Sequence, residues 1–218
     1  MTYENIKNDP AVRCYIEEAD ASLIALGFTE HSFPHVTRTA VMAGQILEEL
    51  GYCKREAELA RIAGFLHDIG NLVNRIEHSQ SGAILAFSVL KSMDFPPEEI
   101  AKIISAIGNH DEGTGTPVNA IAAALILADK SDVRRSRVRN NKLSEFDIHD
   151  RVNYSVTESK LSIHKEQGEV RLSLIIDTEV SSVMEYFEIF LARMLLCQKA
   201  AKTLGLQFRL HINNQSLL

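Results

Sequence analysis

The sequence has no tryptophan and only three cysteines among its 218 residues. Cys14, Cys53 and Cys197 lie far apart and form no Cys-x-x-Cys pair. This pattern argues against both a disulfide framework and a thiolate zinc site. Because unpaired thiols suit a reducing compartment, we expect a cytoplasmic protein.

Long hydrophobic runs are also missing. The longest, AIAAALILA at residues 120–128, is too short to cross a bilayer. The first ten residues, MTYENIKNDP, are polar and do not predict a secretion signal. The formal net charge is −6, with no basic footprint over the chain. We therefore expect no membrane association and no stable nucleic-acid binding.

The residues that are present suit a globular domain. Hydrophobic residues make up 45% of the chain, which is enough for one substantial core, or one core with a small appendage. In the first two thirds, apolar residues recur at helical spacing, and glycine or proline separates the segments. The expected helices span residues 9–26, 35–50, 54–69, 78–92, 97–109 and 118–134.

The pattern changes near residue 143. Apolar residues alternate with period two in VNYSV (152–156), in LSI (161–163) and in VRLSLII (170–176), and KEQG at 165–168 suits a hairpin turn. A long amphipathic helix follows, and FRLHI (208–212) alternates again. We predict a mainly α protein with two parts: a helical domain at 1–142, and a small α+β unit at 143–218 with the order strand–strand–helix–strand.

One polar pair stands where the local physics disfavours it. The stretch FLHDIG at 65–70 ends an apolar helical segment, and we expect Gly70 to stop that helix in a left-handed conformation. Asp68 would then face the negative end of the helix dipole, which costs about 0.3–1 kcal/mol. A bound cation near His67 and Asp68 would compensate. A capped turn with a solvent-facing carboxylate is the alternative for the pair alone.

Other polar residues also occupy unusual positions. Asp129 shares an apolar helix face with Ile121 and Leu125, so it must pair with a cationic side chain, be protonated or bind metal. Helix bundles build metal sites from side chains that several helices direct inward, and imidazoles with carboxylates suit first-row metals. Three further histidines stand at expected helix ends: His35, His78 and His110. The remaining histidines are interpreted as surface or structural residues: His31, His149, His164 and His211.

In this order the residues resemble a known family. His35, the pair His67-Asp68, His78, His110 and Asp129 are similar to the H…HD…H…H…D signature of the HD-domain metal-dependent phosphohydrolases. The flanking stretches LHDIG, HSQSGA and LADKSDVR also match, and the last two resemble the bacterial diadenosine-tetraphosphatase branch. The resemblance covers residues 20–140 and implies a helical HD-domain bundle.

The resemblance further implies a centre of two divalent first-row metal ions. Iron or manganese is favoured, and zinc, cobalt, nickel or magnesium are alternatives. His35, His67, Asp68 and Asp129 would hold one ion, and Asp68, His78 and His110 the other, with Asp68 as the bridge. A hydroxide between the ions would attack a phosphate ester or anhydride of a nucleotide or another small phosphorylated metabolite.

Positive charge near the metals would help to bind such a substrate. Lys130 follows the last expected ligand, and a helix continuing to residue 134 would place Arg134 beside it. We expect these two residues to contact phosphate. Asn71 stands where many relatives carry a lysine after HDIG. Either Lys130 and the following arginines replace that charge, or the substrate is not a typical phosphate ester.

Two other functions remain open at this point. Some HD-domain proteins with a similar six-residue pattern are mixed-valent di-iron oxygenases, and an HD core can also serve as a non-catalytic signalling module. The intact ligand set argues against the module. The substrate, the resident metal and the oligomeric state, including a homodimer, are left open by the sequence.

Overall fold

The structure is a computed structural model that describes residues 1–140 and 145–218. Its first part is helical, as predicted. The helices of this part are α1 (Tyr3–Lys7), α2 (Pro10–Ala25), α3 (Phe33–Glu49), α4 (Lys54–Leu66), η1 (Ile69–Leu72), α5 (His78–Ser92), α6 (Pro97–Gly108), α7 (Ala120–Lys130) and η2 (Arg135–Arg137).

The second part is a small sheet with two α-helices and one short 3-10 helix among the described residues. It contains α8 (Ile148–Ser155), β1 (Val156–His164), η4 (Lys165–Gln167), β2 (Glu169–Ile176), α9 (Val183–Thr203), β3 (Gln207–Ile212) and β4 (Gln215–Ser216). β1 and β2 form an antiparallel hairpin, and Gly168 at its turn has a φ of 65°. β3 pairs with β2 in parallel after the chain crosses over through α9. The order β1, β2, α9 and β3 corresponds to the expected strand, strand, helix and strand, with α8 before it and β4 after it.

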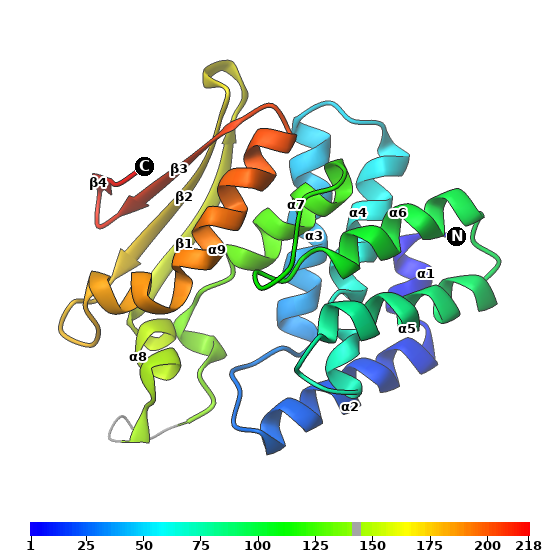
Figure 1. Cartoon of the computed structure of the whole chain (residues 1–218), viewed down its shortest axis with the longest axis horizontal. Coiled ribbons are helices and arrows are strands. Elements are labelled where there is room, and N and C mark those ends of the chain that lie inside the picture. Colours follow the sequence, from blue (N-terminus) through cyan, green and yellow to red (C-terminus); the bar gives the residue numbers. More distant parts are fainter. Residues whose placement is uncertain (141–144) are drawn as a thin grey trace.

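Helix α9 lies between the sheet and the helices of the first part (Figure 1). It packs against α7 on one side and against β3 on the other. Buried residues of α7, α9 and the strands belong to one continuous hydrophobic cluster. The two predicted units thus share a core, and the division at residue 142 stays a prediction.

The predictions for residues 152–156 and for the end of the helix at 118–134 were wrong. The segment VNYSV is mostly helical, because α8 spans Ile148–Ser155 and β1 begins only at Val156. The helix predicted at 118–134 ends at Lys130, and Arg134 has an extended backbone with φ −161° and ψ 149°. Arg134 therefore does not lie one helical turn beyond Lys130.

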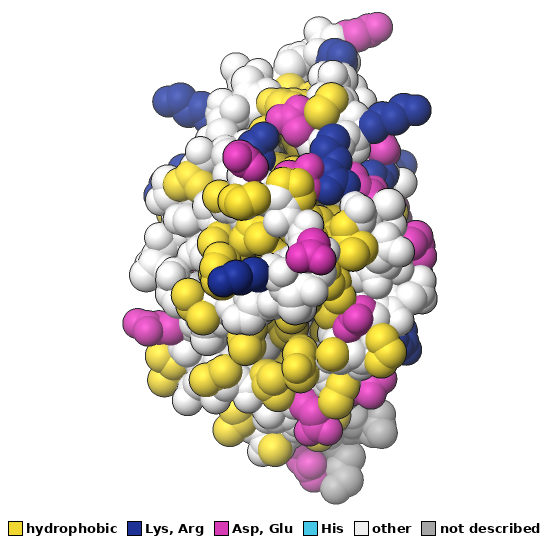
Figure 2. All heavy atoms as spheres, turned by 90° about the vertical axis from the view of Figure 1, so that its right-hand side faces the viewer, with side chains coloured by type: hydrophobic (Ala, Val, Ile, Leu, Met, Phe, Trp, Pro, Cys, Tyr) yellow, Lys and Arg dark blue, Asp and Glu magenta, His cyan; other side chains and the backbone are white. Residues whose placement is uncertain are grey.

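The face over α5 and α6 carries many hydrophobic side chains between scattered charges (Figure 2). Ile84 is 68% exposed and Phe87 is 41% exposed on α5. Phe95 and Ile100 line an apolar hollow beside them.

Within the described ranges, no helix is both long and apolar enough to cross a membrane.

Candidate metal centre

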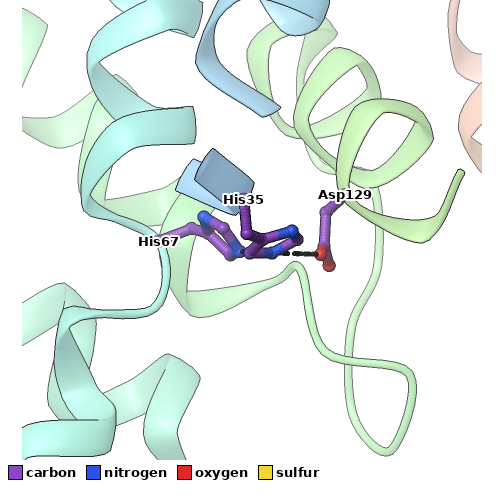
Figure 3. A group of neighbouring side chains, drawn as sticks. All are labelled: His35, His67 and Asp129. Carbon is purple, nitrogen blue, oxygen red and sulfur yellow. Dashed lines mark hydrogen bonds and ion pairs between the residues drawn. The ribbon is translucent and has the colours of Figure 1, made fainter. Parts of the chain in front are cut away.

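Six side chains from five helical elements and their ends converge in the interior. All are buried, with exposed fractions between 0% and 8%. His35 comes from the first turn of α3, His67 from the position directly after α4, and Asp129 from the last turn of α7 (Figure 3). The residues that meet are those predicted to hold metal: His35, His67, Asp68, His78, His110 and Asp129.

Asp68 lies between two pairs of histidines. Its Oδ2 atom is 3.5 Å from His35 Nε2 and 3.3 Å from His67 Nε2. Its Oδ1 atom is 3.5 Å from His78 Nε2 and 3.9 Å from His110 Nε2. Asp129 Oδ1 completes the first group, at 3.3 Å from His35 Nε2. Each oxygen of Asp68 thus faces a different pair, which is the arrangement a bridging carboxylate requires.

The outer nitrogen of each imidazole is fixed by an acceptor. Nδ1 of His67 donates to the carbonyl oxygen of Gly64 at 2.8 Å, and Nδ1 of His110 donates to that of Ile107 at 2.6 Å. His78 makes the corresponding bond to the Arg75 carbonyl at 3.1 Å. Because a carbonyl oxygen only accepts, Nδ1 carries the hydrogen. In a neutral ring, Nε2 then presents a lone pair to the interior.

These lone pairs face one another at short range. Nε2 of His35 is 3.3 Å from Nε2 of His67, and Nε2 of His78 is 3.2 Å from Nε2 of His110. Two lone pairs at this distance repel unless a proton or a metal ion lies between them. Asp68 Oδ2 is also buried, and no described residue gives it a hydrogen bond. The donor set therefore fits metal ions, since imidazole nitrogen and carboxylate oxygen both coordinate first-row metals.

The electrostatics of the centre favour a cation. Burial raises the pKa of Asp68, but the His67 imidazole outweighs this effect and the pKa lies well below the usual range. Burial also raises the pKa of Asp129, but the neighbouring Lys130 ammonium outweighs this effect, and the pKa lies well below its usual range. Burial lowers the pKa of His67, yet Asp68 and Asp129 raise it to about 10. Two ionised carboxylates thus stabilise positive charge here.

Gly70 has a different role from the one predicted. α4 already ends at Leu66, and Gly70 lies in η1 rather than in a left-handed cap. A Cβ atom at Gly70 would lie 1.9 Å from the carbonyl oxygen of His78 and 2.5 Å from the nitrogen of Gly82. The glycine therefore permits α5 to approach closely, which brings His78 to Asp68.

Asp132 belongs to the site but was not predicted from the sequence. Its Oδ2 atom accepts a 2.8 Å hydrogen bond from Nδ1 of His35, and its Oδ1 atom accepts one of 3.0 Å from Arg134 Nε. Burial raises the pKa of Asp132, but the hydrogen bond from His35 and nearby arginines lower it far more. Asp132 follows the last expected ligand by three residues. Because aspartate is common in turns after helices, its position alone does not indicate a role in the site.

The two expected phosphate contacts are each bound to carboxylates. Lys130 is 4% exposed, and its Nζ atom lies 2.8 Å from Asp129 Oδ2 and 2.7 Å from Glu112 Oε2. Arg134 bonds to Asp132 and, at 2.7 Å, to Glu30 Oε2. Their contact with phosphate stays a prediction.

Asn71 connects Asp68 to a cationic side chain. The Asn71 amide donates to the backbone oxygen of Asp68 at 2.9 Å and accepts from Arg75 Nη1 at 3.3 Å.

His31 also lies near the centre, with its ring 5.5 Å from the His35 ring. His31 lines a cavity of about 320 Å³ together with Arg75, Arg193 and residues of α8, among them His149. Both histidines were interpreted as surface or structural residues, because the spacing of neighbouring residues in the sequence does not indicate that they line a cavity.

Comparison with known proteins places the chain in a family. The family described as HD domain matches residues 33–152, more than half of the chain. The chain belongs to the HD-domain family. The match continues past residue 142 and ends within α8.

Individual relatives share about a quarter of their aligned residues with this chain. The uncharacterized protein MJ1020 of Methanocaldococcus jannaschii is 26% identical over 173 residues, covering 68% of this chain and 66% of that protein. Ribonuclease Y of Bacillus subtilis is 28% identical over 119 residues, covering 55% of this chain and 21% of that protein. The chain thus spans about a fifth of ribonuclease Y. A solved structure, a predicted HD superfamily hydrolase from an uncultured Thermotogales bacterium, has 25% identity and a TM-score of 0.44 over 60% of this chain and 73% of its own.

Proposed function

We propose that this protein is a metal-dependent phosphohydrolase with a dinuclear centre, acting on a phosphate ester or anhydride of a small metabolite. One observation carries the proposal: four inward-facing imidazole nitrogens surround Asp68, whose two oxygens face different histidine pairs. Membership of the HD-domain family supports it. His35, His67, Asp68 and Asp129 would hold one ion, and Asp68, His78 and His110 the other.

The chain's own residues prepare the centre. The carbonyl oxygens of Gly64, Arg75 and Ile107 hold three imidazoles with Nε2 inward, and Asp132 does the same for His35. Such outer bonds fix ring orientation and raise ligand basicity. When bound, first-row metal ions supply Lewis-acid stabilisation of phosphoryl oxygens and lower the pKa of water toward neutrality.

A small substrate is favoured over a nucleic acid. Proteins that bind polyanions present clustered basic side chains, whereas this chain has a formal net charge of −6. Neighbouring carboxylates also neutralise Lys130 and Arg134 beside the centre. The cavity next to His31, at about 320 Å³, has the size of a small-molecule site. A nucleotide or a comparable phosphorylated metabolite fits these features.

Metal analysis combined with an activity screen tests the proposal. Protein loaded with manganese, iron or cobalt should release phosphate from at least one compound in a panel of nucleotides, sugar phosphates and p-nitrophenyl phosphate. Asp68→Ala should abolish that release because both groups of ligands lose their shared carboxylate. Asp94→Asn is a suitable control, since Asp94 is exposed in the turn between α5 and α6.

The same preparations separate hydrolysis from the oxygenase alternative. Oxygen uptake by the iron-loaded protein, without phosphate release under any metal, would overturn the hydrolase proposal. Absence of both activities from protein with two bound ions per chain would favour the non-catalytic module.

A further inference from the structure

The cavity beside His31 has walls from both parts of the chain. Phe28 and His31 line it from the segment between α2 and α3, and Arg75 from the segment before α5. Phe190 and Arg193 of α9 line it from the sheet-bearing part. None of the six metal-site residues lines it. The cavity is therefore a neighbouring space, and His31 borders both this cavity and a small one against Asp68.

Two of its arginines are held by aromatic rings and by single hydrogen bonds. The Arg75 guanidinium lies 5.7 Å from the centre of the Phe28 ring, and the Arg193 guanidinium lies 4.4 Å from that of Phe190. Stacking on a ring restrains a guanidinium and leaves its edge available for an anion. Among the described residues, Arg75 donates to Asn71 and Arg193 donates through Nε to Glu112.

Both arginines are also connected to the metal centre. Arg75 supplies the carbonyl oxygen that orients His78. Arg193 bonds to Glu112 Oε1 at 2.9 Å, Glu112 contacts Lys130, and Lys130 contacts the ligand Asp129. A third arginine of the lining, Arg137, is 4% exposed and donates to the backbone oxygens of Glu30 and Asp132.

We propose that Arg75 and Arg193 form a second anion site in this cavity, which binds a phosphate or carboxylate group of the substrate other than the group at the metal centre. This inference rests on the proposed function for the identity of the ligand as a substrate. It implies that the preferred compounds carry at least two anionic groups. It also gives the C-terminal unit a role in selecting the substrate, through α9.

Two acidic residues of the cavity lining supply an internal control. Asp147 and Asp150 of the α8 region line the cavity, and their negative charges oppose an anion. Asp147 caps α8 by accepting from the Asp150 nitrogen at 2.8 Å, so Asp150 is the better site for substitution. Removing its charge should leave the affinity for a second anion unchanged or raise it, whereas removing either arginine should lower it.

Paired probes that differ by one phosphate test the proposal. Calorimetry on the metal-loaded full chain compares ADP with AMP, and fructose 1,6-bisphosphate with fructose 6-phosphate. In at least one pair, the compound with the extra phosphate should bind the wild type more tightly, by about 10- to 100-fold for charge-assisted hydrogen bonds. Arg75→Gln and Arg193→Gln should each remove about tenfold or more of this preference.

The controls determine the interpretation. Asp150→Asn and Arg209→Gln should keep the preference; Arg209 lies on β3, bonded to Glu169, away from the cavity lining. Equal affinity within both pairs, no measurable binding of any probe, or a preference that survives loss of both arginines would overturn the proposal. If phosphate release occurs without such a preference, the hydrolase proposal is supported and the proposal of a second anion site fails. If the preference appears without any hydrolysis, the anion site stands and the hydrolase proposal fails.

Discussion

Asp132 offers a direct test of how the centre is organised. Its carboxylate accepts from Nδ1 of His35 at 2.8 Å and so keeps Nε2 of that ring directed at Asp68 and Asp129. Loss of such an outer partner typically weakens metal binding about 10- to 100-fold. Asp132→Asn retains an oxygen acceptor but loses the charge, so we expect an effect near tenfold. Asp132→Ala loses both, and we expect an effect near a hundredfold.

The expected loss should be confined to one ion. His35 belongs to the group with His67 and Asp129, whereas His78 and His110 are oriented by backbone carbonyls that the substitution does not change. A competition titration of manganese or zinc against a chromophoric chelator should therefore show one weakened step and one unaltered step. A hundredfold loss corresponds to about 2.7 kcal/mol of binding free energy.

Matched measurements separate this effect from general destabilisation. Circular dichroism should show the same helix content in both variants, and Asp94→Asn should titrate like the wild type. If Asp132→Ala binds two ions with wild-type affinity, the orientation of His35 does not depend on this carboxylate. If both steps weaken equally, the two groups of ligands do not act as separate sites.

The remaining predictions concern the ligands and their supports. Asp68→Ala should lose both ions, as measured by metal analysis, and retention of a full complement would contradict its bridging position. His110→Ala should lose mainly the second ion, with the first still titratable. Lys130→Ala should lower the free energy of unfolding by about 3–5 kcal/mol in urea titrations, because the buried Asp129 and the half-buried Glu112 lose their cation; a wild-type midpoint would contradict this. Gly70→Ala should displace α5 and lower the melting temperature together with metal content, whereas normal metal binding would show that α5 can adjust.

Much of the fold could be predicted because its signals are local. The helix predicted at 78–92 has the same bounds as α5, and the turn at 165–168 joins β1 to β2 as expected. The failure at VNYSV has a physical reason. Val152, Ser155 and Val156 are buried, a spacing that suits a helix as well as alternation suits a strand. Five residues are too few to separate the two periods.

The site was less predictable where partners are distant in sequence. Six residues at unusual positions indicated a metal centre, since buried carboxylates and histidines need compensation. Asp132 lies 97 positions from His35, and no spacing rule connects them. Arg193 reaches Glu112 across 81 positions. Such contacts depend on how α3, α7 and α9 pack, which the sequence pattern of each helix does not specify.

The chain of charges from Asp129 to Arg193 gives α9 a part in the site without making it a source of ligands. Asp129 and Glu112 are acids, Lys130 and Arg193 are bases, and they alternate along 2.7–2.9 Å contacts. Alternation leaves this region close to neutral, which limits the cost of burying Asp129 and Lys130 and of half-burying Glu112 and Arg193. It also fixes Asp129 through Lys130 and fixes Arg193 through Glu112. A movement of α9 would therefore be transmitted to Asp129 and would also displace Arg193 in the wall of the adjoining cavity.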